Sequence, residues 1–188
     1  LMQLFLICQA AKLSFAASVH VVMPHFPYAR QDRVAEPREP ISAKLVAHLL
    51  EETGANHLMT LHLHSSQIQG FFSIPVDSLD ARSVLVRYFR EKKLQNPVIV
   101  SPDVGGAKRA KKFADSLGAE LAIMHKTRPQ HQKSEVVEVV GNIEGRTCII
   151  IDDMIDTAGS LCAATQALAA RGALPDVYAV ATHAIFSG

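Results

Sequence analysis

No stretch of this 188-residue sequence approaches the ~20 consecutive apolar residues that a membrane-spanning helix needs. An excess of one charge is also missing, because 19 Lys and Arg residues stand against 18 Asp and Glu residues, for a net charge of +1. This balance excludes electrostatic attraction of the whole surface to nucleic acid or to a membrane, although a local basic pocket remains possible. We therefore expect neither nucleic acid nor a membrane as a partner.

Cysteine is scarce and odd in number, and Cys8, Cys148 and Cys162 lack metal-ligand spacing. They are typical of buried thiols in a reducing compartment rather than of a disulfide framework, which favours the cytoplasm. The apolar start of the chain has no basic segment before it and is interrupted by Gln3 and Lys12, so we expect no secretory signal there. Both ends of the sequence fall within a pattern, which suggests a fragment lacking both termini.

Hydrophobic residues make up 48% of the sequence and charged residues 20%, as in an ordinary globular protein. Short apolar runs alternate with segments of helical period, which predicts an α/β fold with largely parallel sheets. Pro75, Asp77 and Ser78 interrupt the pattern, so we expect two domains, 1–77 and 78–188. The expected strands are 19–23, 58–63, 98–101, 120–124, 136–140, 147–151 and 177–182, and the expected helices are 4–13, 41–53, 81–93, 106–117 and 160–171.

The strongest motif follows the expected strand 147–151. Asp152 and Asp153 come first, and in an extended chain they would point in opposite directions and hold different hydroxyls of one sugar. A short loop then enters a helix, and its N–H groups and hydroxyls suit a phosphate. Carboxylates beside a phosphate loop indicate a sugar phosphate with Mg²⁺; the alternative is that they only cap the turn. The loop residues are Asp156, Thr157, Ala158, Gly159 and Ser160.

Two further segments carry positive charge after an expected strand. The first, Phe26–Arg33, contains Arg30, Gln31, Asp32 and Arg33, and its guanidinium groups suit phosphates and purine stacking, unless it is simply a solvated basic loop. The second runs from Ser101 to Arg109. There Asp103 is an oxygen ligand suited to Mg²⁺, the glycine pair allows close approach of an oxyanion, and basic residues open a helix, unless the segment is a plain turn. Its other candidates are Gly105, Gly106, Lys108 and Arg109.

Together these motifs resemble the ribose-phosphate diphosphokinases (phosphoribosyl pyrophosphate synthetases). The Cys148–Ser160 stretch is similar to the phosphoribosyl-pyrophosphate loop that this family shares with phosphoribosyltransferases, whereas Phe26–Arg33 and Pro40–Lys44 resemble the kinases' ATP-binding loop. Leu63–Phe72 is similar to the segment whose histidine, here His64, binds the metal carried by ATP. The basic segment from His125 resembles the family's flexible catalytic loop, which implies catalytic roles for Lys126 and Arg128.

The resemblance covers essentially the whole chain and implies two phosphoribosyltransferase-like, Rossmann-like domains, both truncated. Residues 1–77 would be the C-terminal part of the ATP-binding domain, and 78–188 most of the ribose-5-phosphate-binding domain. Arg30, Gln31, Asp32 and Arg33 would bind ATP, and His64 and Asp103 would hold Mg²⁺. Asp152, Asp153 and the loop 156–160 would bind ribose 5-phosphate, with Gly105, Gly106, Lys108 and Arg109 at the pyrophosphate. Two departures are His62 and Val34, where the family usually has Asp and Lys.

The implied reaction is transfer of the diphosphoryl group of ATP to the C1 hydroxyl of ribose 5-phosphate, which gives phosphoribosyl pyrophosphate and AMP. The resemblance also implies a homohexamer built from dimers and allosteric binding of phosphate and ADP. Two alternatives stay open: a phosphoribosyltransferase and a non-catalytic regulatory homologue. A fragment without the remaining parts of the family's active site would itself be inactive.

Overall fold

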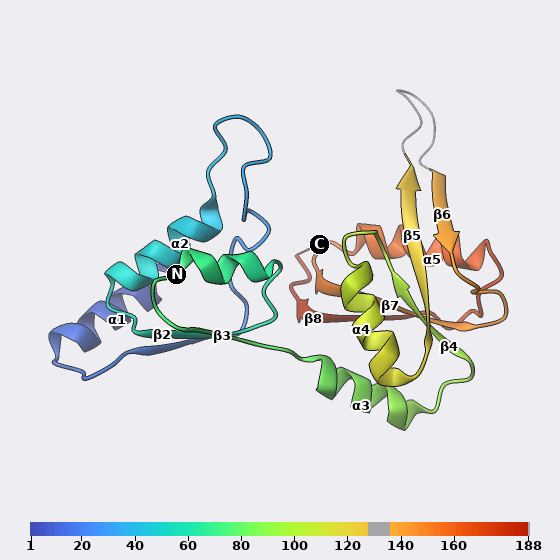
Figure 1. The fold of residues 1–188 in the computed structure, drawn as a ribbon, viewed down its shortest axis with the longest axis horizontal. Helices are drawn as coiled ribbons and strands as arrows, with labels where there is room; N and C mark the ends of the chain where they lie inside the picture. The colour runs from blue at the N-terminus through green and yellow to red at the C-terminus, as the bar shows by residue number, and fades with distance from the viewer. Residues whose placement is uncertain (128–135, 188) are drawn as a thin grey trace. The chain divides into compact units, whose positions relative to one another are not determined.

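The computed structural model describes residues 1–127 and 136–187, and the chain divides into two compact units, Leu1–Asp80 and Ala81–Gly188 (Figure 1). Both units are α/β and built around parallel strands, which confirms the predicted fold class. The domain boundary expected between 77 and 78 falls inside a strand, β3 (Val76–Leu79). This strand is not recognisable in the sequence, because its residues lack alternation of apolar and polar types. Pairing of its backbone with β2 holds it in place.

The first unit is a three-stranded parallel sheet in the order β1-β2-β3, with helices on one of its faces (Figure 1). Alternate residues of the strands, among them Val21 and Leu58, join a core with Phe5 and Leu50 of the helices. The other face of the sheet carries partly or fully exposed side chains. The elements are α1 (Met2–Leu13), β1 (His20–Met23), α2 (Ser42–Glu52), β2 (His57–Leu61) and the 3₁₀ helix η1 (Ser66–Phe71).

The second unit has a five-stranded sheet in the order β6-β5-β4-β7-β8, parallel except for the β5–β6 pair. Its central strands β4 and β7 are buried on both faces, so apolar residues follow one another there without alternation. Ile99 and Ile149 pack with α3 and α4, whereas Val98 and Ile150 pack with α5 on the opposite face. The elements are α3 (Arg82–Lys92), β4 (Pro97–Ser101), α4 (Ala107–Leu117), β5 (Glu120–Thr127), β6 (Val136–Val140), β7 (Thr147–Ile155), α5 (Gly159–Ala169) and β8 (Tyr178–Ala184).

This strand order gathers the predicted motifs within each unit. In the second unit, β4 lies between β5 and β7 and is parallel to both, so the segments that follow these three strands leave the same edge of the sheet. From β4 the chain first adds β5 on one side and later adds β7 on the other side. In parallel sheets, such a reversal of strand order opens a crevice where ligands bind. In the first unit, the segments after β1 and β2 share an edge for the same reason.

Two strands, β5 and β7, continue well beyond the ends that the sequence predicted. β7 continues to Ile155, because Asp152 and Met154 still pair with Ala181 and His183 of β8. The two carboxylates therefore stand on the strand and not in the loop after it. β5 continues to Thr127 and pairs with β6, so Lys126 lies at a strand end rather than in a loop. Arg128 lies outside the described residues.

No helix within the described residues is long and apolar enough to cross a membrane. Two of the three free cysteines, Cys8 and Cys148, are buried as expected, and desolvation raises the pKa of both thiols. The expectation was wrong for Cys162, which is exposed in the first turn of α5. Leu161 and Ala164 face the core instead, since they lie on the side of the helix that meets the sheet.

This arrangement predicts the order of thiol modification. In the native protein at pH 8, a disulfide reagent such as Ellman's reagent should modify one thiol rapidly, and Cys162→Ser should remove that fast phase. Cys8 and Cys148 should react only with the rate of unfolding, because they are buried and their raised pKa values reduce the thiolate fraction. Rapid reaction of two thiols would contradict the burial of these residues.

Candidate functional site

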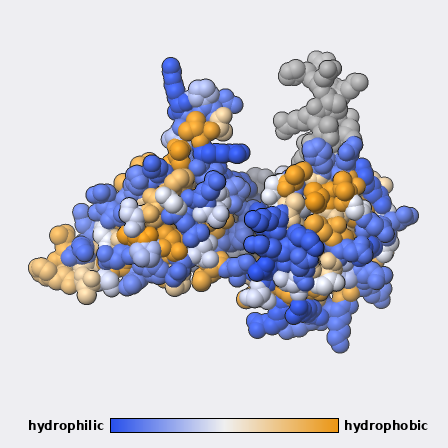
Figure 2. Space-filling model, viewed as in Figure 1, coloured by the Kyte–Doolittle hydropathy of each residue, from blue (hydrophilic) through white to orange (hydrophobic). Residues whose placement is uncertain are grey.

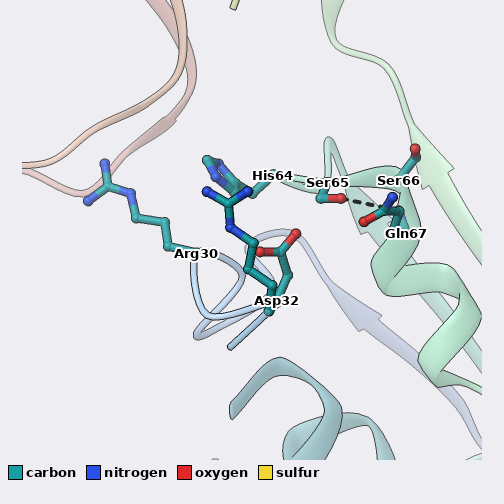
Figure 3. A pocket seen from close by; sticks show the side chains of 7 residues that line it. Arg30, Asp32, His64, Ser65, Ser66 and Gln67 are labelled. Carbon is teal, nitrogen blue, oxygen red and sulfur yellow. Dashed lines mark hydrogen bonds between the residues drawn. The ribbon is translucent and has the colours of Figure 1, made fainter. Parts of the chain in front are cut away.

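A polar pocket of about 340 Å³ lies at the carboxyl edge of the first unit's sheet (Figure 3). It brings together residues from the segments after β1 and β2 that the sequence had proposed separately for ATP and for metal. Figure 3 shows Arg30 extending to one side of the pocket, while the Asp32 carboxylate lies on the same side as His64. The lining residues are Arg30, Asp32, Arg33, His64, Ser65, Ser66 and Gln67.

The loop after β1 is fixed by apolar anchors, which leaves its charged side chains at the pocket. Phe26 is buried and packs edge-on against Phe72, with ring centroids 5.7 Å apart. Tyr28 has a positive φ of 57° and accepts a hydrogen bond from the Gln31 N–H, which closes a tight turn. The Gln31 carbonyl accepts from the N–H of Ala43 in α2. Gln31 therefore ties the loop to a helix, and its side chain is not among the pocket lining.

Sequence reasoning missed the three polar residues after His64. The Ser65 hydroxyl accepts a hydrogen bond from the Gln67 N–H at 3.3 Å and so begins η1 (Figure 3). Buried Ile68 holds this short helix to the core, which fixes Ser66 and Gln67 at the pocket. The polar stretch from His64 to Gln69 could have indicated these residues, but within it only the histidine is an obvious metal ligand.

In the second unit, the segment after β4 forms a tight turn around Asp103. Its Oδ1 accepts a hydrogen bond from the Gly106 N–H at 2.7 Å, and its carbonyl accepts from the Ser101 hydroxyl. A Cβ added at Gly106 would lie 2.9 Å from the Ser101 Oγ, so a larger residue here would displace the buried Ser101 hydroxyl. No hydrogen bond within the described residues engages the Asp103 Oδ2. The exposed carboxylate thus both builds the turn and presents an oxygen.

The two carboxylates of β7 do not point in opposite directions, so that prediction was wrong. One nitrogen of Arg109, Nη1, donates to Asp152 Oδ1 and to Asp153 Oδ1, each at 3.0 Å. The Asp153 N–H also donates to Asp152 Oδ1 at 2.8 Å, which turns this carboxylate back along the strand. Arg109, expected at a pyrophosphate, is therefore engaged by the acidic pair. Its neighbour Lys108 stays exposed on α4. Figure 2 shows a largely hydrophilic surface where α4 lies in Figure 1.

The acidic pair lies in a setting that opposes full ionisation. Asp153 is buried, and Asp152 is half-buried. Desolvation and, after it, the neighbouring Asp153 side chain together raise the pKa of Asp152 to about 6, although the Asp153 N–H and the Arg109 charge act to lower it. The Arg109 guanidinium thus offsets part of the repulsion and desolvation of two adjacent carboxylates. A ligand that donates hydrogen bonds here, or a bound cation, would stabilise their ionised forms further.

This pKa predicts how stability changes with pH. Since Asp152 binds a proton more tightly when folded than when unfolded, where its pKa is about 4, stability should fall as the pH rises from about 4 to 6. We expect a loss on the order of 2 kcal/mol over that window, allowing for partial exposure. Asp152→Asn should flatten the profile in chemical denaturation and be the more stable protein at pH 7. An unchanged slope in the variant would contradict the shifted pKa.

The loop after β7 leads into α5 through a strained residue. Ala158 has a positive φ of 61° at the N-cap position, and its carbonyl accepts the first helical hydrogen bond, from Cys162. Asp156 accepts a hydrogen bond from the Ser187 hydroxyl, which ties the loop to the segment after β8. Thr157, Gly159 and Ser160 are exposed at the start of the helix. The loop therefore exposes hydroxyls and N–H groups of the kind that bind an anion, and the binding of a phosphate here stays a prediction.

The described residues contain no group of three or more His, Cys, Asp or Glu side chains suited to a metal ion. Asp32 in the first unit and Asp103 in the second each offer a carboxylate that suits Mg²⁺ on its own. Mg²⁺ is commonly bound through one or two carboxylates plus substrate phosphates and water. His64 is a less typical ligand for this ion because Mg²⁺ prefers oxygen.

Comparison with known proteins identifies both units. The family described as the N-terminal domain of ribose phosphate pyrophosphokinase matches residues 1–54, and the phosphoribosyl transferase domain matches 77–186. Ribose-phosphate pyrophosphokinases of Oceanobacillus iheyensis and Halalkalibacterium halodurans are 50% and 52% identical over all 188 residues. The chain spans 59% of the length of each.

The crystal structure of a phosphoribosylpyrophosphate synthetase from Mycobacterium smegmatis is similar over 97% of this chain and 59% of its own. The TM-score is 0.91 and the sequence identity 44%. The likeness thus extends through both units. The chain belongs to the phosphoribosyl transferase domain family, and over its whole length it is similar to ribose-phosphate pyrophosphokinases.

Proposed function

We propose that this chain carries the ribose-phosphate diphosphokinase reaction, the transfer of a diphosphoryl group from ATP to the C1 hydroxyl of ribose 5-phosphate. The observation that carries the proposal is the pairing, in one chain, of an arginine-lined pocket after β1 with an acidic strand end and phosphate loop after β7. The names of the relatives support the same reaction. A sugar-phosphate loop alone would not separate this function from other phosphoribosyl chemistry.

Ribose 5-phosphate is assigned to the second unit. The loop of Thr157, Gly159 and Ser160 would hold the 5-phosphate with N–H groups and hydroxyls at the start of α5. Asp152 and Asp153 would accept hydrogen bonds from the ribose hydroxyls. Because both carboxylates already contact Arg109, we assign this arginine to positioning them rather than to direct contact with pyrophosphate. Gly105, Gly106 and Lys108 remain the candidates for the pyrophosphate region.

ATP is assigned to the pocket of the first unit. Arg30 and Arg33 would pair with phosphate oxygens, and planar guanidinium groups also stack on a purine ring. Asp32 and His64 line the same pocket and would hold Mg²⁺ there, and Asp103 is a separate candidate ligand within the second unit. The ion would supply neutralisation of the triphosphate charge when bound.

The chemistry asked of the protein is positioning and charge stabilisation. A bond forms between the C1 oxygen and the β-phosphorus of ATP, the bond from that phosphorus to the α,β-bridging oxygen breaks, and AMP leaves. The proton of the C1 hydroxyl is lost, and we nominate no side chain as its acceptor. Lys126 and Arg128 would stabilise the charge that develops on the transferred group. Aligning the two substrates supplies much of the remaining acceleration.

The same kinship extends the proposal to assembly and location. We propose a homohexamer built from dimers, regulated by phosphate and ADP, in the cytoplasm. Light scattering of the purified chain measures the assembly, and a titration with ADP at fixed phosphate measures the regulation.

The experiment that tests the function is release of AMP from ATP with ribose 5-phosphate, Mg²⁺ and no nucleobase. The chain should be assayed alone and as a chimera that replaces the matching segment of the Halalkalibacterium halodurans relative. AMP and phosphoribosyl pyrophosphate formed in equal amounts support the proposal. A chimera that folds and forms neither product contradicts it, and pyrophosphate release that requires a nucleobase would assign the chain to the phosphoribosyltransferases.

A further inference from the structure

Four polar side chains on the exposed face of the first unit form a continuous chain that the proposed function does not use. The Ser18 hydroxyl lies 2.9 Å from His20 Nε2, and His20 Nδ1 lies 3.2 Å from His57 Nδ1. The other ring nitrogen of His57, Nε2, lies 3.2 Å from an Asp77 carboxylate oxygen. These residues come from β1, β2, β3 and the turn before β1.

The two histidines are held side by side by strand register. His20 and His57 are each the first residue of their strand and are direct partners in the parallel pairing of β1 with β2. Their rings therefore project from the same face of the sheet, with centroids 5.4 Å apart and an angle of 74° between the planes.

We propose that His20 and His57 form a binding site for Zn²⁺, with both Nδ1 atoms as ligands. Two nitrogens bound to one tetrahedral zinc at 2.0–2.1 Å lie about 3.3 Å apart. The separation of 3.2 Å between the Nδ1 atoms matches this spacing closely. Imidazole nitrogen is a ligand preferred by zinc and copper, whereas Mg²⁺ prefers oxygen, so the site selects a different class of ion from the one proposed for catalysis.

Asp77 and Ser18 supply the outer contacts that such a site needs. Metal-bound histidines usually donate the remaining ring N–H to a carboxylate or another acceptor, which fixes the tautomer and the ring orientation. Asp77 takes this role for His57, because accepting the Nε2 proton leaves the lone pair on Nδ1. Ser18 is placed to do the same for His20. The carboxylate thus lies behind the ring and is not itself a ligand.

The site has two protein ligands, and water would complete the coordination. This agrees with the lack of any cluster of three or more metal-ligating side chains in the described part of the chain. Because the ion would join β1 to β2, binding should also stabilise the first unit against unfolding. The proposal does not depend on the proposed function, since none of its residues lines the pocket of Figure 3.

The test is a titration with zinc chloride, followed by NMR of the chain labelled with ¹⁵N in its histidine rings. We expect the Nδ1 resonances of His20 and His57 to shift together and saturate at one equivalent, while both Nε2 atoms stay protonated. Recording each histidine separately distinguishes this site from zinc held at His64. If the Nδ1 resonances of both residues stay unchanged while zinc saturates the protein, the proposal is overturned. The contact between the two rings is then only a hydrogen bond.

Variants add a second, independent readout. His20→Gln changes an exposed side chain and should abolish the zinc-dependent shift of His57, whereas His48→Gln, an exposed histidine of α2, should leave it unchanged. Asp77→Asn should weaken zinc binding by about 10–100-fold through loss of the outer contact. Zinc should raise the denaturation midpoint of the wild type and of His48→Gln but not of His20→Gln. Equal stabilisation of all three proteins would overturn the proposal.

Discussion

Lys126→Ala should lower the rate of AMP release at saturating substrates by roughly 10²–10³-fold, the loss expected when a preorganised donor to developing negative charge is removed. Lys126 lies near the end of β5, where it pairs with Val137 of β6, and on the edge of the sheet from which the Asp103 turn also leaves. Because its proposed contact forms with the transferred group in the transition state, the KM values for both substrates should change only a few-fold.

The matched control is Lys112→Ala, which removes the same charge from an exposed position of α4. It should change the rate less than twofold. A Lys126→Ala protein with a nearly normal rate, measured in the active chimera, would remove this residue from the mechanism. A loss confined to KM would assign Lys126 to substrate binding instead.

Arg109→Met should destabilise the protein by about 2–4 kcal/mol at pH 8, because removal of one partner leaves two adjacent carboxylates uncompensated. The estimate is below that for a fully buried pair, since the Arg109 side chain is 24% exposed and that of Asp152 is 30% exposed. The loss should shrink towards pH 5, where Asp152 takes up a proton that relieves the repulsion. Urea denaturation at both pH values measures the difference.

Two variants distinguish this ion pair from a general effect of the substitution. Lys108→Met makes the same charge change at the exposed neighbouring position and should cost less than about 0.5 kcal/mol. Asp153→Asn in the Arg109→Met background should recover part of the stability, since it removes one of the two stranded charges. If Arg109→Met and Lys108→Met were equally stable at both pH values, the contact between Arg109 and the acidic pair would make no contribution to stability.

The fold was largely predictable because its elements are marked by local chemistry. Apolar runs such as 147–151 predicted buried strands, and Gly118, which has a φ of 77°, ends α4 where the sequence placed a stop. Grouping of the motifs was also predictable, since carboxyl ends of parallel strands share an edge. β3 escaped detection because a strand held mainly by its backbone pairing leaves little pattern in its side chains.

The direction of individual side chains was not predictable. Alternation along an extended chain placed Asp152 and Asp153 on opposite sides, but a guanidinium from α4, over 40 residues away in sequence, draws both to one nitrogen. Gln31 matched a nucleotide loop, yet its backbone ties that loop to α2. The pair of His20 and His57 depends on register between two strands separated by a loop and a helix, which no local pattern reveals.

The central claim is that each unit binds its own substrate, ribose 5-phosphate at the β7 carboxylates and ATP at the arginine-lined pocket. Calorimetric titration of both ligands into wild type, Asp152→Ala and Arg33→Ala tests it most directly. Asp152→Ala should lose at least about tenfold in affinity for ribose 5-phosphate, from charged hydrogen bonds, and keep its affinity for ATP, whereas Arg33→Ala should show the reverse. Equal losses for both ligands in either variant would contradict the assignment of substrates to the two units.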